Sequence, residues 1–176
     1  MIILKQNRIR KIWAESLRFH GKACASLALG VRVCDTALSR LGLDAPEPER
    51  LVCVSENDGC CVDAIQIGLN CTIGKRHLLF YKTGRLIFTV YDLKGSGSVR
   101  MVTRPEIAGR LCRMQPAEVL STPEQALFTF EEARPMTQRV WERVTRACDA
   151  PGEQPPSREP GVQDCPEIFR KFDLPK

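Results

Sequence analysis

Two short segments of this chain are rich in cysteine, histidine, carboxylate and carboxamide side chains. The residues around them have apolar side chains at the spacing of core-forming helices and strands. The two segments are residues 19–24 and residues 56–66, and a third segment follows at residues 71–75. Burying thiol, imidazole and carboxylate groups costs free energy unless they are paired or bind a metal. The segments therefore predict a metal or thiol site built into an apolar framework.

The spacing of apolar residues predicts two amphipathic helices around the first segment. Residues 8–18 place their apolar side chains on one helical face, and residues 24–42 repeat this pattern. We expect the first helix to end just before His20. The second helix would carry Cys24 in its first turn.

The middle of the chain alternates strand-like runs with turn residues. We expect a buried strand at 51–55, a short helix at 61–69, and strands at 78–82, 86–92 and 98–103. The connectors of the last three strands, Thr83-Gly84 and residues 94–97, suit hairpin turns. The expected fold class is therefore α+β, with an antiparallel β-meander packed against helices.

Helix starts are expected again towards the C-terminus. Pro105 is one, and Thr122 forms a capping-box pattern with Gln125, with Pro123 at the first helical position. Residues 136–147 form a further amphipathic stretch.

The length and the proline content predict the domain organisation. A chain of 176 residues is enough for one domain, or for one domain with a small appendage. Residues 149–166 hold five prolines and few large apolar groups, which is typical of a flexible linker or tail. We predict a core domain over residues 1–148 and a proline-rich linker and tail over residues 149–176.

Composition narrows the class of protein. The net charge of +5 is small, and the basic residues are scattered along the chain rather than clustered. The composition therefore does not indicate nucleic-acid binding. No apolar run reaches the ~18 residues of a membrane span, and the N-terminus lacks the features of a signal peptide. We expect a cytoplasmic protein that binds no membrane. Its nine cysteines then indicate reduced thiols, metal ligands or small core residues rather than disulfides.

His20 and Cys24 are the first candidate ligands. They are four residues apart and would share one face if a helix extended over both. Imidazole and thiolate at this spacing suit zinc or a related transition metal. The same spacing also fits a helix-capping histidine beside a buried cysteine, and this alternative stays open.

The turn after the first expected strand carries a second set of candidates. Cys60 and Cys61 are adjacent, so one is expected to face the site and the other the core. Asp63 and Gln66 are three residues apart and would share a face of the following helix. Alternatively, Asp58 caps this helix and both cysteines are core residues.

The third segment, residues 71–75, is a candidate edge of the same site. The spacing of a nucleotide-binding P-loop is absent. Lys75 would neutralise an anionic substrate, or it is an ordinary surface lysine. His77 follows at the start of an expected strand, where we expect a surface or interface position.

Together the segments resemble the FmdE family, which is named for formylmethanofuran dehydrogenase. The family's opening motif, approximately FHGHxCPGxxxG, is matched by Phe19, His20, Gly21, Cys24 and Gly30, while Lys22 replaces its second histidine. The second motif, approximately ENDxCxxDAIQxxxGCTxGK, is matched by Glu56, Asn57, Asp58, Cys60, Asp63, Ala64, Ile65, Gln66, Cys71, Thr72, Gly74 and Lys75. The chain lacks the cysteine pairs that build a C-terminal zinc finger in some members.

The resemblance implies an intertwined homodimer with a cleft lined by the two motifs. It implies a divalent transition metal, with zinc favoured, and the candidate ligands His20, Cys24, Cys60 and Cys71. The residues expected to orient ligands or contact substrate are Lys22, Asn57, Asp58, Asp63, Gln66, Thr72 and Lys75.

Three functions follow, in order of preference. The first is a metal-binding accessory or maturation factor for a molybdenum, tungsten or other metalloenzyme of one-carbon or redox metabolism, with that enzyme as partner. The second is an enzyme that acts on a small anionic substrate, with Cys24 or Cys60 as nucleophile and His20 as general base. The third is a structural protein whose motif residues serve folding alone.

Overall fold

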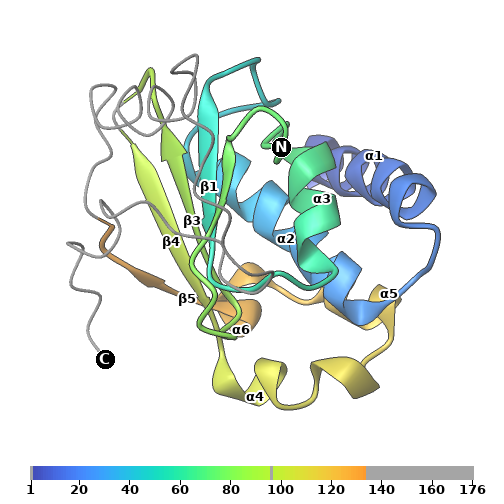
Figure 1. The fold of residues 1–176 in the computed structure, drawn as a ribbon. Coiled ribbons are helices and arrows are strands. Elements are labelled where there is room, and N and C mark those ends of the chain that lie inside the picture. Colours follow the sequence, from blue (N-terminus) through green and yellow to red (C-terminus); the bar gives the residue numbers. More distant parts are fainter. Residues whose placement is uncertain (1, 96, 134–176) are drawn as a thin grey trace.

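The computed structural model has a five-stranded sheet with helices gathered against one of its faces (Figure 1). It describes residues 2–95 and 97–133. The helices are α1 (Ile2–His20), α2 (Ala25–Arg40), α3 (Cys61–Gly68), α4 (Pro105–Ala108), α5 (Pro116–Ser121) and α6 (Glu124–Leu127), with a short 3-10 helix, η1, at Leu111–Arg113. The strands are β1 (Leu51–Ser55), β2 (Leu78–Phe80), β3 (Ile87–Asp92), β4 (Ser98–Thr103) and β5 (Phe128–Glu131). The α+β class is confirmed.

The sheet is mixed, so the expected antiparallel meander is only partly right. Its strand order is β2-β1-β3-β4-β5, and all neighbours are antiparallel except β1 and β2. β2 does not pair with β3, as a meander requires, because β1 lies between them. The reason is α3, which follows β1 and returns the chain to the same end of the sheet, so that β2 runs parallel to β1.

The end of the described chain also differs from the expectation. Thr122 does not cap a helix, because its hydroxyl donates to Glu118 O (2.7 Å) at the end of α5. The helix that follows, α6, has only four residues and gives way directly to β5. β5, which was not predicted, pairs with β4 and brings Phe128 into the core.

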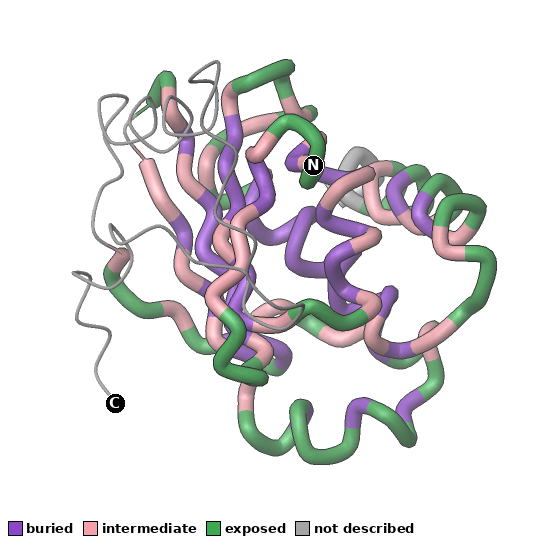
Figure 2. The backbone as a smooth tube through the Cα atoms, in the orientation of Figure 1, coloured by how far each residue is buried: buried purple, intermediate pink, exposed green. Residues whose placement is uncertain are grey.

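The core is organised around α2. Every residue from Leu27 to Leu38 is buried, and this helix contacts α1, α3, α5, η1 and β4 (Figure 2). The polar Asp35 in this run is paired with Arg8 of α1, whose guanidinium lies 2.8 Å from the carboxylate. A helix buried on nearly all sides is typical of a central position.

The bounds of α1 differ from the expected range at both ends. α1 begins at Ile2 rather than at residue 8, and it includes His20 instead of ending before it. Among the helices that the structure describes, none combines the length and the apolarity needed to cross a membrane. The predicted amphipathic stretch at 136–147 and the predicted tail at 149–176 lie outside the described residues.

Candidate metal site

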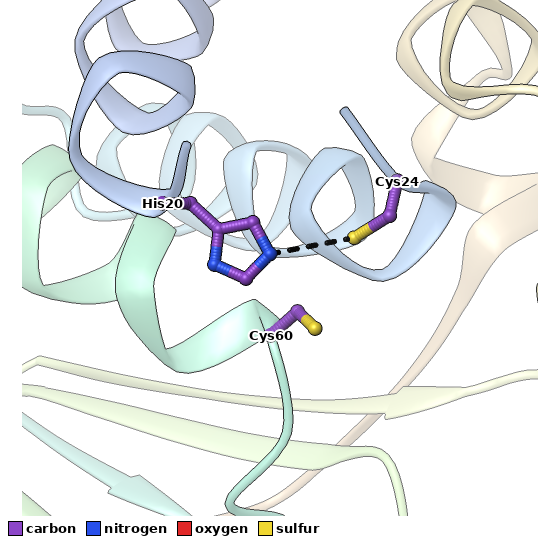
Figure 3. A group of neighbouring side chains, drawn as sticks. All are labelled: His20, Cys24 and Cys60. Carbon is purple, nitrogen blue, oxygen red and sulfur yellow. Dashed lines mark hydrogen bonds between the residues drawn. The ribbon is translucent and has the colours of Figure 1, made fainter. Parts of the chain in front are cut away.

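Three predicted ligands meet where the C-terminus of α1 and the N-termini of α2 and α3 converge (Figure 3). One ligand atom from each of His20, Cys24 and Cys60 lies within 4.8 Å of the others. All three side chains are partly buried. Two of them come from the first crowded segment and one from the second, so the fold joins the two segments into one site.

A tight link between α1 and α2 positions His20 and Cys24. Gly21 has a φ of +77°, in the left-handed region that glycine adopts most readily, and it ends α1 through a hydrogen bond to Leu17 O. Cys24 then caps α2, and its sulfur accepts a hydrogen bond from Leu27 N (3.3 Å). The cysteine is therefore held by a cap rather than inside a helix.

Cys60 reaches the same point because α3 lies unusually close to α2. The contact is made at Gly30, where an added Cβ would lie 2.8 Å from Cys61 Cα and 2.9 Å from Ala64 Cβ, and closer still to the Cys61 carbonyl oxygen. Only glycine leaves room for this approach. The position of Cys60, next to Cys61, therefore depends on the absence of a side chain at residue 30.

Asp63 orients the imidazole of His20. Its Oδ2 lies 2.6 Å from His20 Nδ1, and the opposite ring nitrogen, Nε2, lies 3.9 Å from Cys24 Sγ. When the carboxylate accepts a hydrogen bond from the Nδ1–H group, the lone pair of the neutral imidazole lies on Nε2 and faces the cysteines. Metal-binding histidines in proteins are commonly held in this way by a carboxylate.

The three donor atoms lie close enough together to hold a metal ion. Tetrahedral coordination at ordinary Zn–N and Zn–S lengths separates donor atoms by about 3.6–3.8 Å, close to the 3.9 Å between His20 Nε2 and Cys24 Sγ. Burial, together with the nearby charge and hydrogen bonding of Cys24, raises the pKa of Cys60. A metal must therefore displace the proton that this thiol otherwise keeps.

Cys61 and Cys71 lie in the core. Cys61 is fully buried beside Ser26 Oγ (3.2 Å), while Cys60 joins the ligand group, so one of the adjacent cysteines faces the site and the other the interior, as expected. Cys71, expected as a further ligand, is not in the group, and its thiol donates to Leu51 O (3.3 Å). Burial raises the pKa of each of these two thiols to about 12.

Several residues expected to orient ligands or contact substrate make hydrogen bonds and ion pairs in the loops next to the site. Asn57 Oδ1 accepts a hydrogen bond from Gly59 N (2.7 Å), and Asp58 forms an exposed ion pair with Lys82 (2.8 Å). The Lys82 ammonium, through its hydrogen bond and its charge, lowers the pKa of Asp58. Both motif residues shape the turn that leads into Cys60.

The residues expected after α3 form a second local network. Gln66 Oε1 accepts from Ile73 N (3.3 Å), and Thr72 Oγ1 accepts from Lys75 N (3.2 Å). Lys75 Nζ donates to Asn70 Oδ1 (2.9 Å). Lys22, in contrast, is exposed in the link between His20 and Cys24.

Glu56 is a buried anchor of the motif that was not predicted as such. Its carboxylate, almost inaccessible to solvent, lies 2.7 Å from Arg100 and 3.0 Å from Arg85, and it accepts a hydrogen bond from the Thr83 hydroxyl. It ties the loop before Cys60 to β4 and to the loop before β3. An acidic residue directly after a buried strand was the only sign of this in the sequence.

His77 is also buried, which corrects the expected surface or interface position. Its Nδ1 lies 2.9 Å from Leu51 O, and burial lowers its pKa. It therefore belongs to the packing of β1 rather than to the ligand group.

The fold and the site define an α+β protein with a His-Cys-Cys group able to hold a metal ion. A family model described as "FmdE, Molybdenum formylmethanofuran dehydrogenase operon" matches residues 19–149. The chain therefore belongs to the FmdE family, and the match includes every member of the ligand group.

A curated relative gives a more distant comparison. It is a "Probable S-adenosyl-L-methionine-binding protein" from Archaeoglobus fulgidus, 28% identical over 143 residues. The aligned region covers 79% of this chain and 39% of the relative, so this chain spans only about two fifths of that protein's length.

Proposed function

We propose that this chain binds one zinc-like divalent ion and acts as an accessory or maturation factor for a metalloenzyme related to formylmethanofuran dehydrogenase. The observation that carries the proposal is the convergence of His20, Cys24 and Cys60 with Asp63 behind the histidine. Membership of the FmdE family supports the link to that enzyme.

The donor set also suggests the kind of metal site. Thiolates are soft ligands and imidazole is a borderline one, so two thiolates with one imidazole favour zinc over magnesium or calcium. Three protein ligands leave a fourth position of a tetrahedral ion open. A bound ion would supply a Lewis acid at that position, or an exchangeable metal for delivery to a partner.

Metal analysis tests the proposal directly. Protein purified without a tag and reconstituted under reducing conditions should hold about one ion per chain. Cys24→Ser and Cys60→Ser should each lose most of it, whereas Cys112→Ser, which removes an exposed thiol outside the group, should not. Less than about a tenth of an equivalent in reconstituted wild type would contradict the proposal.

Asp63→Asn tests the role of the carboxylate behind His20 without changing a ligand. The amide can still reach Nδ1 but carries no charge, so we expect metal affinity to fall about 10–100-fold. Competition with a chromophoric chelator measures this, and the matched control is Asp58→Asn, in the turn before α3 and paired with Lys82. Equal metal affinities for the two variants would show that the Asp63 carboxylate does not contribute to metal binding.

A thiolate enzyme is the second candidate, and one observation favours it. Cys24 Sγ, His20 and Asp63 form a line of contacts of 3.9 Å and 2.6 Å, the order of nucleophile, base and orienting carboxylate. In metal-free protein, this function requires Cys24 to react with iodoacetamide much faster than Cys112 near neutral pH. Equal rates at the two cysteines would rule it out.

We also propose the homodimer expected from the family. Among the described residues, the large apolar side chains most exposed to solvent are Phe19 (58%), next to His20, and Ile73 (52%). An interface between two copies would remove them from water. Light scattering at several protein concentrations tests this, and a monomer throughout would contradict it.

A further inference from the structure

Cys24 and Cys60 are a thiol pair as well as two ligands. They come from the N-caps of two different helices, and their sulfur atoms lie within 4.8 Å of each other. Both are partly accessible, whereas Cys34, Cys53, Cys61 and Cys71 are buried. Among the cysteines that the structure describes, this pair therefore combines proximity with access to a dissolved oxidant.

The two caps allow the sulfurs to meet. A disulfide has an S–S bond of about 2 Å, so the gap to be closed is at most about 3 Å. Cys60 precedes the first turn of α3 and its side chain does not cap that helix, so the thiol can turn further towards Cys24 without removing a helix cap. Cys24 is held in place by the hydrogen bond from Leu27 N.

We propose that Cys24 and Cys60 are a reversible oxidation site, which forms a disulfide when hydrogen peroxide reaches the metal-free protein. The Cys24 thiol gives up its proton, and its thiolate attacks one peroxide oxygen; an S–O bond forms, the O–O bond breaks, and the departing hydroxide combines with that proton as water. The Cys60 sulfur then attacks the Cys24 sulfenic acid; the S–S bond forms, the S–O bond breaks, and the released hydroxide takes the Cys60 proton as water. Overall, two thiols and one peroxide give one disulfide and two waters.

The oxidation would compete with metal binding. A disulfide removes both sulfur ligands and leaves His20 as the remaining member of the group, so an ion is released. Conversely, a bound ion occupies both sulfurs and protects them. This second part rests on the proposed function, but the disulfide itself does not.

Peptide mapping of the full chain tests the inference. Reduced, chelator-treated protein is exposed to hydrogen peroxide, quenched with an alkylating agent, and cleaved after Lys and Arg and before Asp. Cys24 then lies in residues 23–32, and Cys60 lies in residues 58–62 together with Cys61. We expect a cross-link between these two peptides, lost on reduction and absent from Cys60→Ser.

Cys61→Ala is the matched control, because it removes the neighbouring thiol and leaves Cys60. It should retain the cross-link. A cross-link that disappears with Cys61→Ala, or oxidation of Cys24 to sulfinic acid with no cross-link in wild type, would overturn the inference.

A parallel sample saturated with Zn²⁺ separates the two proposals. Protection of at least about tenfold in the rate of cross-linking is expected from ligated sulfurs. A cross-link in protein that binds no zinc would support the oxidation site and contradict the metal function. Zinc binding without any cross-link after chelation would support the metal function and contradict the oxidation site.

Discussion

Gly30→Ala should damage the site without changing any ligand. The new methyl group would lie 2.8 Å from Cys61 Cα and 2.9 Å from Ala64 Cβ, where carbon atoms ordinarily approach to about 3.5–4.0 Å. Backbone atoms of α3 cannot move aside by rotating a side chain. We therefore expect α3 to shift away from α2 by about 1 Å.

The energetic cost has two opposing parts. Overpacking of a well-packed core costs about 1–3 kcal/mol, and here the upper end applies because the contact is with backbone. Alanine in place of glycine inside a helix returns about 1 kcal/mol. The net loss in the free energy of unfolding should therefore be about 2 kcal/mol.

The shift should also weaken metal binding. Cys60 precedes Cys61 directly, so a displacement of about 1 Å exceeds the tolerance of about 0.2 Å in metal–ligand distances. We expect affinity to fall about 10–100-fold. Denaturant unfolding of the metal-free, reduced protein measures stability, and chelator competition measures affinity.

Gly74→Ala is the matched control. Its added Cβ would meet nothing within 4 Å, and the residue has no positive φ. Its stability should stay within about 0.5 kcal/mol of wild type. If Gly30→Ala behaved in the same way in both assays, the close approach of α2 and α3 would not be what positions Cys60.

Three further predictions concern charge and protonation. Glu56→Gln should cost about 2–3 kcal/mol of unfolding free energy, because the buried guanidinium of Arg100 keeps only the half-exposed carboxylate of Glu131 as its ion partner. Asp58→Asn, at an exposed pair, should cost less than about 1 kcal/mol. Because the pKa of His77 is lowered in the folded protein, the unfolded chain binds a proton at this residue more readily. The free energy of unfolding should therefore fall as the pH drops below about 6.5. Denaturation curves at several pH values should show a smaller fall for His77→Gln. The raised pKa of Cys60 means that a metal must displace its proton, so chelator competition should show affinity rising across neutral pH, by up to about tenfold per pH unit for each proton released.

The sequence predicted most of the local structure because local spacing carries it. The bounds of α2, α3, β3 and β4 agree with the expected ranges to within two residues. Local spacing does not predict which strands pair, because any of several strands can lie beside a given strand in the sheet. The parallel pairing of β1 with β2 depends on where α3 returns the chain, and no short stretch of sequence encodes that.

β5 was missed for a related reason. Its four residues follow a pattern at Thr122 and Pro123 that favours a helix, and a helix does form, but it ends after one turn. Pairing with β4 and burial of Phe128 then favour the strand. Tertiary packing outweighed a local preference.

The candidate site shows the same division. Sequence alone determined that this chain carries an α+β core with imidazole, thiol and carboxylate groups in two segments, because residue type and spacing are local properties. The sequence motifs offered Cys60 and Cys71 alike as ligands, and only the tertiary structure brings Cys60 to His20 and Cys24 and turns Cys71 into the core. It also sets Asp63 against an imidazole 43 residues away. Those choices depend on how closely α1, α2 and α3 pack, and that packing is set by contacts such as Gly30 against Cys61, between residues distant in the chain.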